Sequence, residues 1–170
     1  AQNRPRLYII GQRVSRMSKT FKFPPAEPRV KLRDILDAPL QGPRRALPRA
    51  RTGRRALRKA TLKWKKRGVD VNKSWVVVDI MSSPSRSSSM RKCLPCLTAS
   101  RAAAGGHWIT CLHRVLRPAE LLRAQGFDPE VVRWRGILTE RQLGAAVGNS
   151  MTQTTLAALL ERLLPSVGLL

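Results

Sequence analysis

Positive charge is concentrated in the first half of the chain, which limits where a hydrophobic core can form. Residues 1–92 carry 25 Lys and Arg residues against 5 acids, whereas residues 93–170 carry 8 and 5. Like charges at this density oppose a compact state unless a polyanion neutralises them. We therefore expect an ordinary folded segment in the second half and nucleic-acid binding in the first half. The alternative is a basic surface that only contacts solvent.

The basic half contains an acid-free stretch, residues 40–69. From Thr52 onward the stretch has the pattern of a helix, with Trp64 on the apolar side and Gly68 as the stop signal. Lys and Arg on such a helix neutralise phosphates and release counterions. Contacts of this kind position a nucleic acid but do not read its sequence. The phosphate contacts that we predict here are Arg54, Arg55, Arg58 and Lys59.

Two apolar runs predict buried strands, residues 7–10 (LYII) and residues 75–80 (WVVVDI). In front of the first run, Gln2, Arg4 and Arg6 alternate, so all three project to one side of an extended backbone. Guanidinium groups on a core strand are costly unless they meet a ligand. We therefore expect this strand to hold its polar side chains against a bound group.

Residues that typically begin or end helices predict three helices in the second half of the chain. Pro118 and Gly126 bracket a short helix. Thr139 followed by Gln142 forms a capping box at the start of the second helix. The third helix carries a leucine stripe that we expect to pack in the core, and Pro165 is expected to end it. The leucines of that stripe are Leu156, Leu159, Leu160, Leu163 and Leu164.

Four motifs, taken in order, carry a family resemblance. Residues 2–6 (QNRPR) resemble a Gln-x-Arg-x-Arg motif, and residues 94–106 (LPCLTASRAAAGG) are similar to a segment that closes a target-recognition region. Residues 114–127 (RVLRPAELLRAQGF) resemble an Arg-x-Leu…Gln-Gly-Phe motif, and residues 147–151 (VGNSM) resemble a Gly-Asn-Ser/Ala motif. Together they resemble the C-terminal portion of the C5-cytosine DNA methyltransferases.

The resemblance covers residues 1–36 and 90–164. It implies an α/β fold, namely the C-terminal portion of a Rossmann-like S-adenosylmethionine-dependent methyltransferase domain plus an irregular basic target-recognition region. It also implies three parts: a catalytic-domain strand and connector (1–39), the target-recognition region (40–113), and C-terminal helices that return to the catalytic domain (114–170).

Several motifs of the family do not occur in this sequence. These are its glycine-bearing cofactor loop, its Pro-Cys-Gln nucleophile and its Glu-Asn-Val acid. Cys96 follows a proline but precedes Leu97, so we do not assign it as the nucleophile. The chain does not begin with methionine, and we expect it to belong to a longer protein and to be inactive alone. It also departs from the family pattern at Ala119, at Asp128-Pro129 and at Ala146.

The resemblance implies a reaction and roles for individual residues. Enzymes of this family flip a cytosine out of the duplex, add a cysteine thiolate to C6, and transfer methyl from S-adenosylmethionine to C5. Arg6 is implied to hold the cytosine oxygen O2 while charge builds in the ring, with Arg4 and Gln2 orienting the base and the catalytic loop. Asn149 and Ser150 are implied to bind the cofactor, with a helix N-cap as the ordinary alternative.

The recognition segment carries two possible chemistries. The resemblance places Thr98, Ser100, Gly105 and Gly106 where they contact base edges or a DNA groove. The spacing Cys93-x-x-Cys96 instead suits a small zinc site. Because the recognition role already accounts for the segment, we predict no metal. The other ligands of such a zinc site would be His107, Cys111 and His113.

Three interpretations of the function stay open. They are a DNA cytosine-5 methyltransferase, a tRNA cytosine-5 methyltransferase, and a non-catalytic remnant that binds nucleic acid without base preference. The sequence has no run of membrane-spanning length and no apolar signal segment, so we expect no membrane partner. Three cysteines favour a reducing compartment. We expect the nucleus in a eukaryote and the cytoplasm otherwise.

Overall fold

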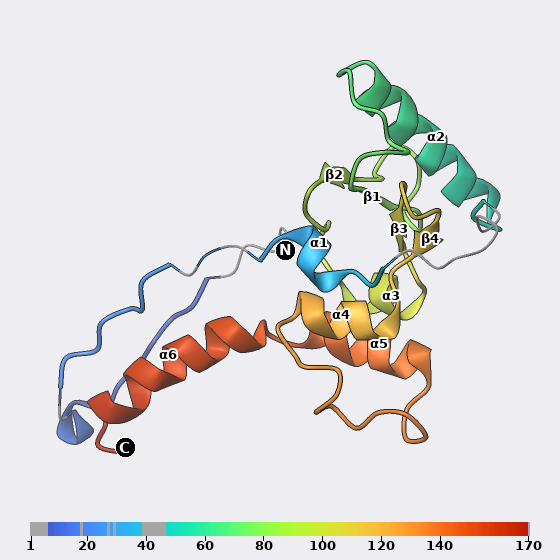
Figure 1. Cartoon of the computed structure of the whole chain (residues 1–170). Coiled ribbons are helices and arrows are strands. Elements are labelled where there is room, and N and C mark those ends of the chain that lie inside the picture. Colours follow the sequence, from blue (N-terminus) through green and yellow to red (C-terminus); the bar gives the residue numbers. More distant parts are fainter. Residues whose placement is uncertain (1–6, 18, 27, 29, 39–46, 170) are drawn as a thin grey trace.

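A small antiparallel sheet lies at the centre of the structure, which is a computed structural model (Figure 1). The strand order is β2-β1-β3-β4, so β1 and β3 are the inner strands. The strands are β1 (Val76–Asp79), β2 (Ser89–Arg91), β3 (His107–Ile109) and β4 (Arg114–Val115). The structure describes residues 7–17, 19–26, 28, 30–38 and 47–169.

Strand β1 confirms the strand predicted at residues 75–80 and explains its composition. Val76, Val77 and Val78 are fully buried, because β1 lies between two neighbours and both faces of the sheet are covered. β-Branched side chains suit such a strand, since they pack well on a pleated surface. Val77 joins one hydrophobic cluster, while Val76 and Val78 join the other.

Helix α2 (Arg51–Lys65) covers the second face of the sheet and confirms the predicted basic helix. It packs closely through small residues, Gly53, Ala56 and Ala60. A Cβ on Gly53 would lie 3.2 Å from the carbonyl oxygen of Ile80, so the helix axis can approach the sheet at this point. Gly68 follows the helix with φ of +69°, as expected of a glycine stop.

The first face of the sheet is covered by α1 (Leu32–Ile35), α3 (Ala99–Ala103), α4 (Pro118–Ala124) and α5 (Glu140–Asn149). The two predicted helix starts are confirmed. Pro118 occupies the first turn of α4, and Thr139 and Gln142 form the capping box of α5, with the Thr139 N–H donating to Gln142 Oε1 at 2.9 Å. The predicted mixture of helices and a sheet is thus confirmed, with the strands antiparallel, while the Rossmann-like arrangement and the irregular basic recognition region stay predictions.

Helices α3 and α5 touch along two glycines of α5. A Cβ on Gly144 would lie 2.6 Å from the carbonyl oxygen of Ala102, and a Cβ on Gly148 would overlap the backbone nitrogen of Ala99. Both positions are buried. The two glycines, four residues apart on one helix face, therefore let the backbones of α3 and α5 come into direct contact.

Helix α6 (Gln153–Ser166) extends away from the sheet beside the N-terminal segment (Figure 1). Leu159 is buried, but Leu156 and Leu160 are 36% and 38% exposed, so the prediction that the whole leucine stripe packs in the core is wrong. The helix reaches too few neighbours in the described chain to cover that face. Its end lies one residue beyond the predicted stop, because Pro165 is accommodated within the last turn.

The strand predicted at residues 7–10 is also wrong. Leu7 and Ile9 are 85% and 86% exposed, and the segment is not a strand. A strand needs a backbone partner and a face to bury, and the described residues supply neither to this segment. The contacts of the N-terminal segment are with the end of α6: the Lys19 N–H donates to the Ser166 carbonyl at 3.3 Å, and Gln12 Nε2 donates to Ser166 Oγ. A single-turn 3₁₀ helix, η1 (Val14–Arg16), lies between Gln12 and Lys19 in the sequence.

The α3–α5 contact predicts that Gly148→Ala destabilises the protein. An exposed helical Gly→Ala change normally stabilises by up to about 1 kcal/mol. Here the added methyl group collides with the backbone of α3, and we expect a loss of about 1–3 kcal/mol in the free energy of unfolding, measured by urea denaturation. Gly11→Ala is the control, because no atom lies within 4 Å of its Cβ position. Equal stability of the Gly148→Ala protein and the parent would contradict the contact.

Candidate functional site

A buried ion pair lies at the centre of the motif in residues 114–127. Arg114 at the start of β4 and Glu120 in the first turn of α4 pair through two bonds, of 2.7 Å to Oε2 and 2.6 Å to Oε1. Their side chains are 6% and 0% exposed. The Glu120 carboxylate also accepts the backbone N–H groups of Arg117 at 2.7 Å and Asp37 at 2.8 Å. A buried carboxylate with this many donors is fully compensated.

Asp37 extends the network from the other end of the sequence. Its carboxylate pairs with Arg123 at 2.7 Å and Arg117 at 3.2 Å. Burial raises the pKa of Asp37, but hydrogen bonds and attraction from the two guanidinium groups outweigh that effect and hold the pKa below its usual 3.8. The connector after α1 is therefore fastened to α4 by charge as well as by packing.

Gln125 fastens α4 to the junction between α5 and α6. The side chain is fully buried, and its Nε2 donates to the Val147 carbonyl at 2.9 Å while its Oε1 accepts the Thr152 hydroxyl at 3.1 Å. The Gln125 carbonyl also accepts the N–H of Gln153 at 2.8 Å. Gly126 follows with φ of +85°, which a side chain would strain. This glutamine thus fixes the place where the Gly-Asn-Ser motif leaves α5.

The two predicted cofactor residues lie at that junction. Asn149 is the last residue of α5 and is exposed, and Ser150 is the C-cap, whose hydroxyl donates to the Val147 carbonyl at 2.8 Å. The N-cap alternative is wrong, because Thr152 is the N-cap of α6. The pair alone does not fit S-adenosylmethionine: neither residue lines any of four open cavities in the described chain, and the Ser150 hydroxyl hydrogen is already committed.

The predicted recognition residues do not share one environment. Ser100 is exposed on α3, whereas Thr98 is the half-buried N-cap of that helix. Gly105 turns the chain with φ of +64°, and Gly106 is buried against the Arg101 carbonyl. Of the four, Ser100 is therefore the most open to a ligand.

Asp79 forms a second buried charge site that sequence reasoning did not identify. It is fully buried at the end of β1 and pairs with Arg101 Nε at 2.9 Å. Its other carboxylate oxygen accepts the N–H groups of Met81 at 3.0 Å and Ser82 at 3.2 Å. The signal was present in the sequence, since a carboxylate within an apolar strand run must find donors when it is buried.

His107 lies on β3 opposite Asp79 and is 1% exposed. Burial lowers its pKa to about 4, against an opposing attraction from Asp79. Its Nε2 atom has no hydrogen-bond partner among the described residues. The zinc alternative receives no support from the geometry: within the described ranges no group of three or more His, Cys, Asp or Glu side chains is placed to hold a metal ion. The three cysteines are free thiols.

The predicted phosphate contacts all lie on α2 and are exposed. Arg54 donates to the carbonyls of Pro48 at 3.2 Å and Arg49 at 2.7 Å, and Lys59 donates to the carbonyl of Pro84 at 2.8 Å. The other two predicted contacts, Arg55 and Arg58, make no hydrogen bond or ion pair within the described part of the chain. The residues predicted to hold the base, Gln2, Arg4 and Arg6, lie outside the described residues.

A comparison with protein families found one match that covers almost the whole chain. The sequence model of the C-5 cytosine-specific DNA methylases matches residues 1–164. The chain belongs to this family. The match includes both the base-holding motif and the network around Glu120, and it confirms the resemblance seen in the sequence. A comparison with curated protein sequences found no match. The family transfers methyl groups to cytosine in DNA. No helix among the described residues is long and apolar enough to span a membrane.

Loss of the Glu120 carboxylate is expected to lower the free energy of unfolding strongly. Glu120→Gln leaves the Arg114 guanidinium buried without a counter-charge, which costs about 3–5 kcal/mol in similar sites. Chemical denaturation measures the loss. Glu130→Gln is the matched control, because Glu130 is exposed, and its effect should stay within about 0.5 kcal/mol. A loss below about 1 kcal/mol for Glu120→Gln would show that the pair is not the anchor described.

His107 predicts a pH dependence of stability. Its pKa is lower folded than unfolded, so the unfolded chain takes up the proton first. The free energy of unfolding therefore has its full value above pH 6.5. It falls by roughly 3 kcal/mol as the pH drops from 6.5 toward 4. Thermal denaturation across this range should show the loss, and His107→Leu should flatten it. His113→Asn is the control that should keep it, since asparagine tolerates the φ of +50° found there.

Proposed function

We propose that this methylase chain is the C-terminal part of a DNA (cytosine-5) methyltransferase, which moves a methyl group from S-adenosylmethionine to C5 of a flipped-out cytosine. The observation that carries the proposal is the family match over residues 1–164. It is supported by the intact network around Glu120, which ties the connector, α4 and the α5–α6 junction together.

Arg6 is the residue with a direct role in the proposed reaction. Its planar, permanently charged guanidinium would donate to the cytosine oxygen O2 as negative charge builds in the ring. Arg4 and Gln2 would orient the base and the catalytic loop. The guanidinium is needed most in the transition state, so its loss lowers turnover more than DNA affinity.

The cofactor would be bound mainly by protein segments other than these 170 residues. S-adenosylmethionine supplies the methyl group in this family. Asn149, exposed at the end of α5, would contribute at most one wall of its site, because neither Asn149 nor Ser150 lines any of the four open cavities. The Pro-Cys-Gln and Glu-Asn-Val motifs also do not occur in the sequence. We therefore expect these 170 residues to bind DNA without methylating it.

A second candidate function is a non-catalytic DNA- or RNA-binding remnant. The observation that favours it is the excess of 20 positive charges in residues 1–92, which binds polyanions whatever their sequence. Such a remnant would not support methyl transfer even when it is joined to an N-terminal half that carries the nucleophile and the acid. A tRNA substrate in place of DNA is a further outcome that the same assay separates. A nuclear or cytoplasmic location follows from either substrate.

The test supplies the family motifs that do not occur in this sequence. The chain is joined to a family N-terminal half that carries the nucleophile and the acid, and methyl incorporation into duplex DNA and tRNA is measured. We expect activity on DNA, and Arg6→Ala should lower kcat by about 10²–10³ with DNA affinity nearly unchanged. Arg13→Ala, an exposed position outside the motif, is the control. Wild-type turnover in Arg6→Ala would disprove the base-holding role, and no transfer in the joined protein would favour the remnant.

A further inference from the structure

The positive charge of α2 has no counter-charge in the described structure. The ion pairs among the described residues use Arg33, Arg101, Arg114, Arg117 and Arg123, and none involves α2. The helix and its flanks, residues 51–67, contain no acid. A cluster of this kind repels itself, so the folded state is stabilised by an anion that lies along it.

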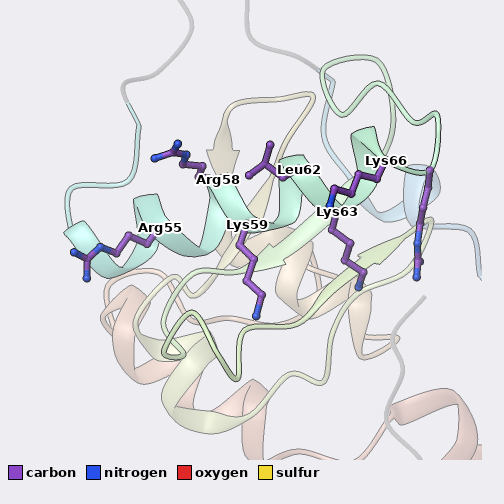
Figure 2. A pocket seen from close by; sticks show the side chains of 7 residues that line it. Arg55, Arg58, Lys59, Leu62, Lys63 and Lys66 are labelled. Carbon is purple, nitrogen blue, oxygen red and sulfur yellow. The ribbon is translucent and has the colours of Figure 1, made fainter.

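The cations of α2 form two adjacent ridges. One ridge carries Arg55, Lys59 and Lys63 at intervals of four residues, and the next carries Arg58, Leu62 and Lys66. With a rise of 1.5 Å per residue, each step along a ridge is about 6 Å, and the charged face is roughly 16 Å long. These residues, with Arg67, line an open groove of about 580 Å³. In Figure 2, Lys59 and Lys63 point to one side of the helix and Arg58 and Leu62 to the other.

Three cations of the charged face, Lys59, Lys63 and Arg67, are held by neighbouring groups. Trp64 donates from Nε1 to Ser89 Oγ at 3.0 Å and carries the Lys63 and Arg67 cations over its ring at 5.5 and 5.3 Å. Lys59 is attached to the loop that follows β1 through the Pro84 carbonyl. A pre-organised cationic face loses little side-chain freedom when it meets an anion, which favours binding.

This face lies on the opposite side of the sheet from α3, α4 and α5, the helices that carry parts of three family motifs. α2 packs on the face formed by Val76, Val78 and Trp108, while α3, α4 and α5 pack on the face formed by Val77 and Ile109 (Figure 1). Ser100 and Asn149 belong to helices of that other face. An anion bound by α2 is therefore held apart from Ser100 and Asn149.

The chemistry of the face selects a backbone rather than bases. The seven residues that line the groove are six cations and Leu62, with no aromatic ring. Single strands are held largely by stacking of bases on aromatic side chains, which this face does not offer. Evenly spaced cations instead match the regular phosphates of a duplex, whose contacts carry no sequence information.

We propose that the α2 face is a separate DNA-binding surface, which holds the sugar–phosphate backbone of duplex DNA independently of any cytosine. The identity of the duplex as DNA rests on the proposed function. The surface supplies affinity, while the chemistry belongs to other parts of the protein. The consequence is a protein that binds DNA without a target site and whose binding falls steeply with salt.

The test uses the complete 170-residue chain and a short fluorescent duplex made only of A·T pairs, which contains no cytosine. Binding is followed by anisotropy at several salt concentrations, beside a mixed-sequence DNA duplex and an RNA duplex of equal length. We expect the two DNA duplexes to bind within a few-fold of each other. Binding of the mixed duplex alone would show that the face reads bases and would overturn the proposal, and a tenfold preference for the RNA duplex would overturn its choice of partner.

The variant that isolates the surface combines Arg55→Gln, Arg58→Gln and Lys66→Gln. These residues line the groove and make no hydrogen bond or ion pair in the described chain, and glutamine keeps the helix propensity, so the fold should persist. The slope of log K against log salt should fall by about 2 to 3, since each lost phosphate contact removes about 0.9. The matched control, Arg133→Gln, Arg141→Gln and Arg162→Gln, removes three exposed cations elsewhere and should keep the slope.

Equal losses in the two triple variants would show that net charge alone drives binding, and an unchanged slope in the α2 variant would show that the face is not used. Either result would overturn the proposal. Circular dichroism of both variants confirms that they remain folded. The methyl-transfer assay is independent of these measurements: an inactive joined protein whose chain still binds the A·T duplex would disprove the proposed function and leave the surface in place.

Discussion

The rest of the fold depends on the pairing of Arg114 with Glu120. A guanidinium and a carboxylate that are both removed from water are costly, and they are tolerated here because the geometry is bidentate and further N–H donors reach the carboxylate. The pair joins the last strand of the sheet to the first turn of α4. Through the N–H of Asp37 it also fixes the connector, so the sheet, the helices and the N-terminal part are oriented from one buried point.

The structure divides two tasks between the two faces of one sheet. One face carries the buried polar network and the junction at the end of α5, where the side chains of Glu120 and Gln125 are hydrogen-bonded within the protein. The other face carries α2, whose cations have no acidic partner among the described residues. A protein that acts on DNA needs both kinds of surface, because precise chemistry requires satisfied, rigid groups while binding to phosphates requires unsatisfied charge.

Local signals predicted the elements that depend on local chemistry. The valine run became β1, the acid-free stretch became α2, and the Pro118 and Thr139 signals marked the starts of α4 and α5. Leu7 and Ile9 and the outer leucines of α6 belong to similar apolar patterns but stay exposed. Periodicity reports that a face is able to be buried, and only the presence of a neighbour decides whether it is.

The candidate site was less predictable for a related reason. Glu120 and Gln125 lie within one family motif, but their partners are distant in sequence: Asp37 lies 83 residues before Glu120, and Val147 lies 22 after Gln125. No periodic pattern encodes such pairs. The backbone contact between α3 and α5 was equally hidden, since Gly148 was interpreted only as part of a Gly-Asn-Ser motif.

That contact has a mechanical consequence. With no side chains between them at Gly144 and Gly148, α3 and α5 have no soft layer that would let one slide past the other. Helix α3, in the segment predicted to close the recognition region, and helix α5 therefore move as one rigid unit. If the predicted recognition region tilts to accommodate a duplex, the end of α5 moves with it. DNA binding would then displace Asn149 directly.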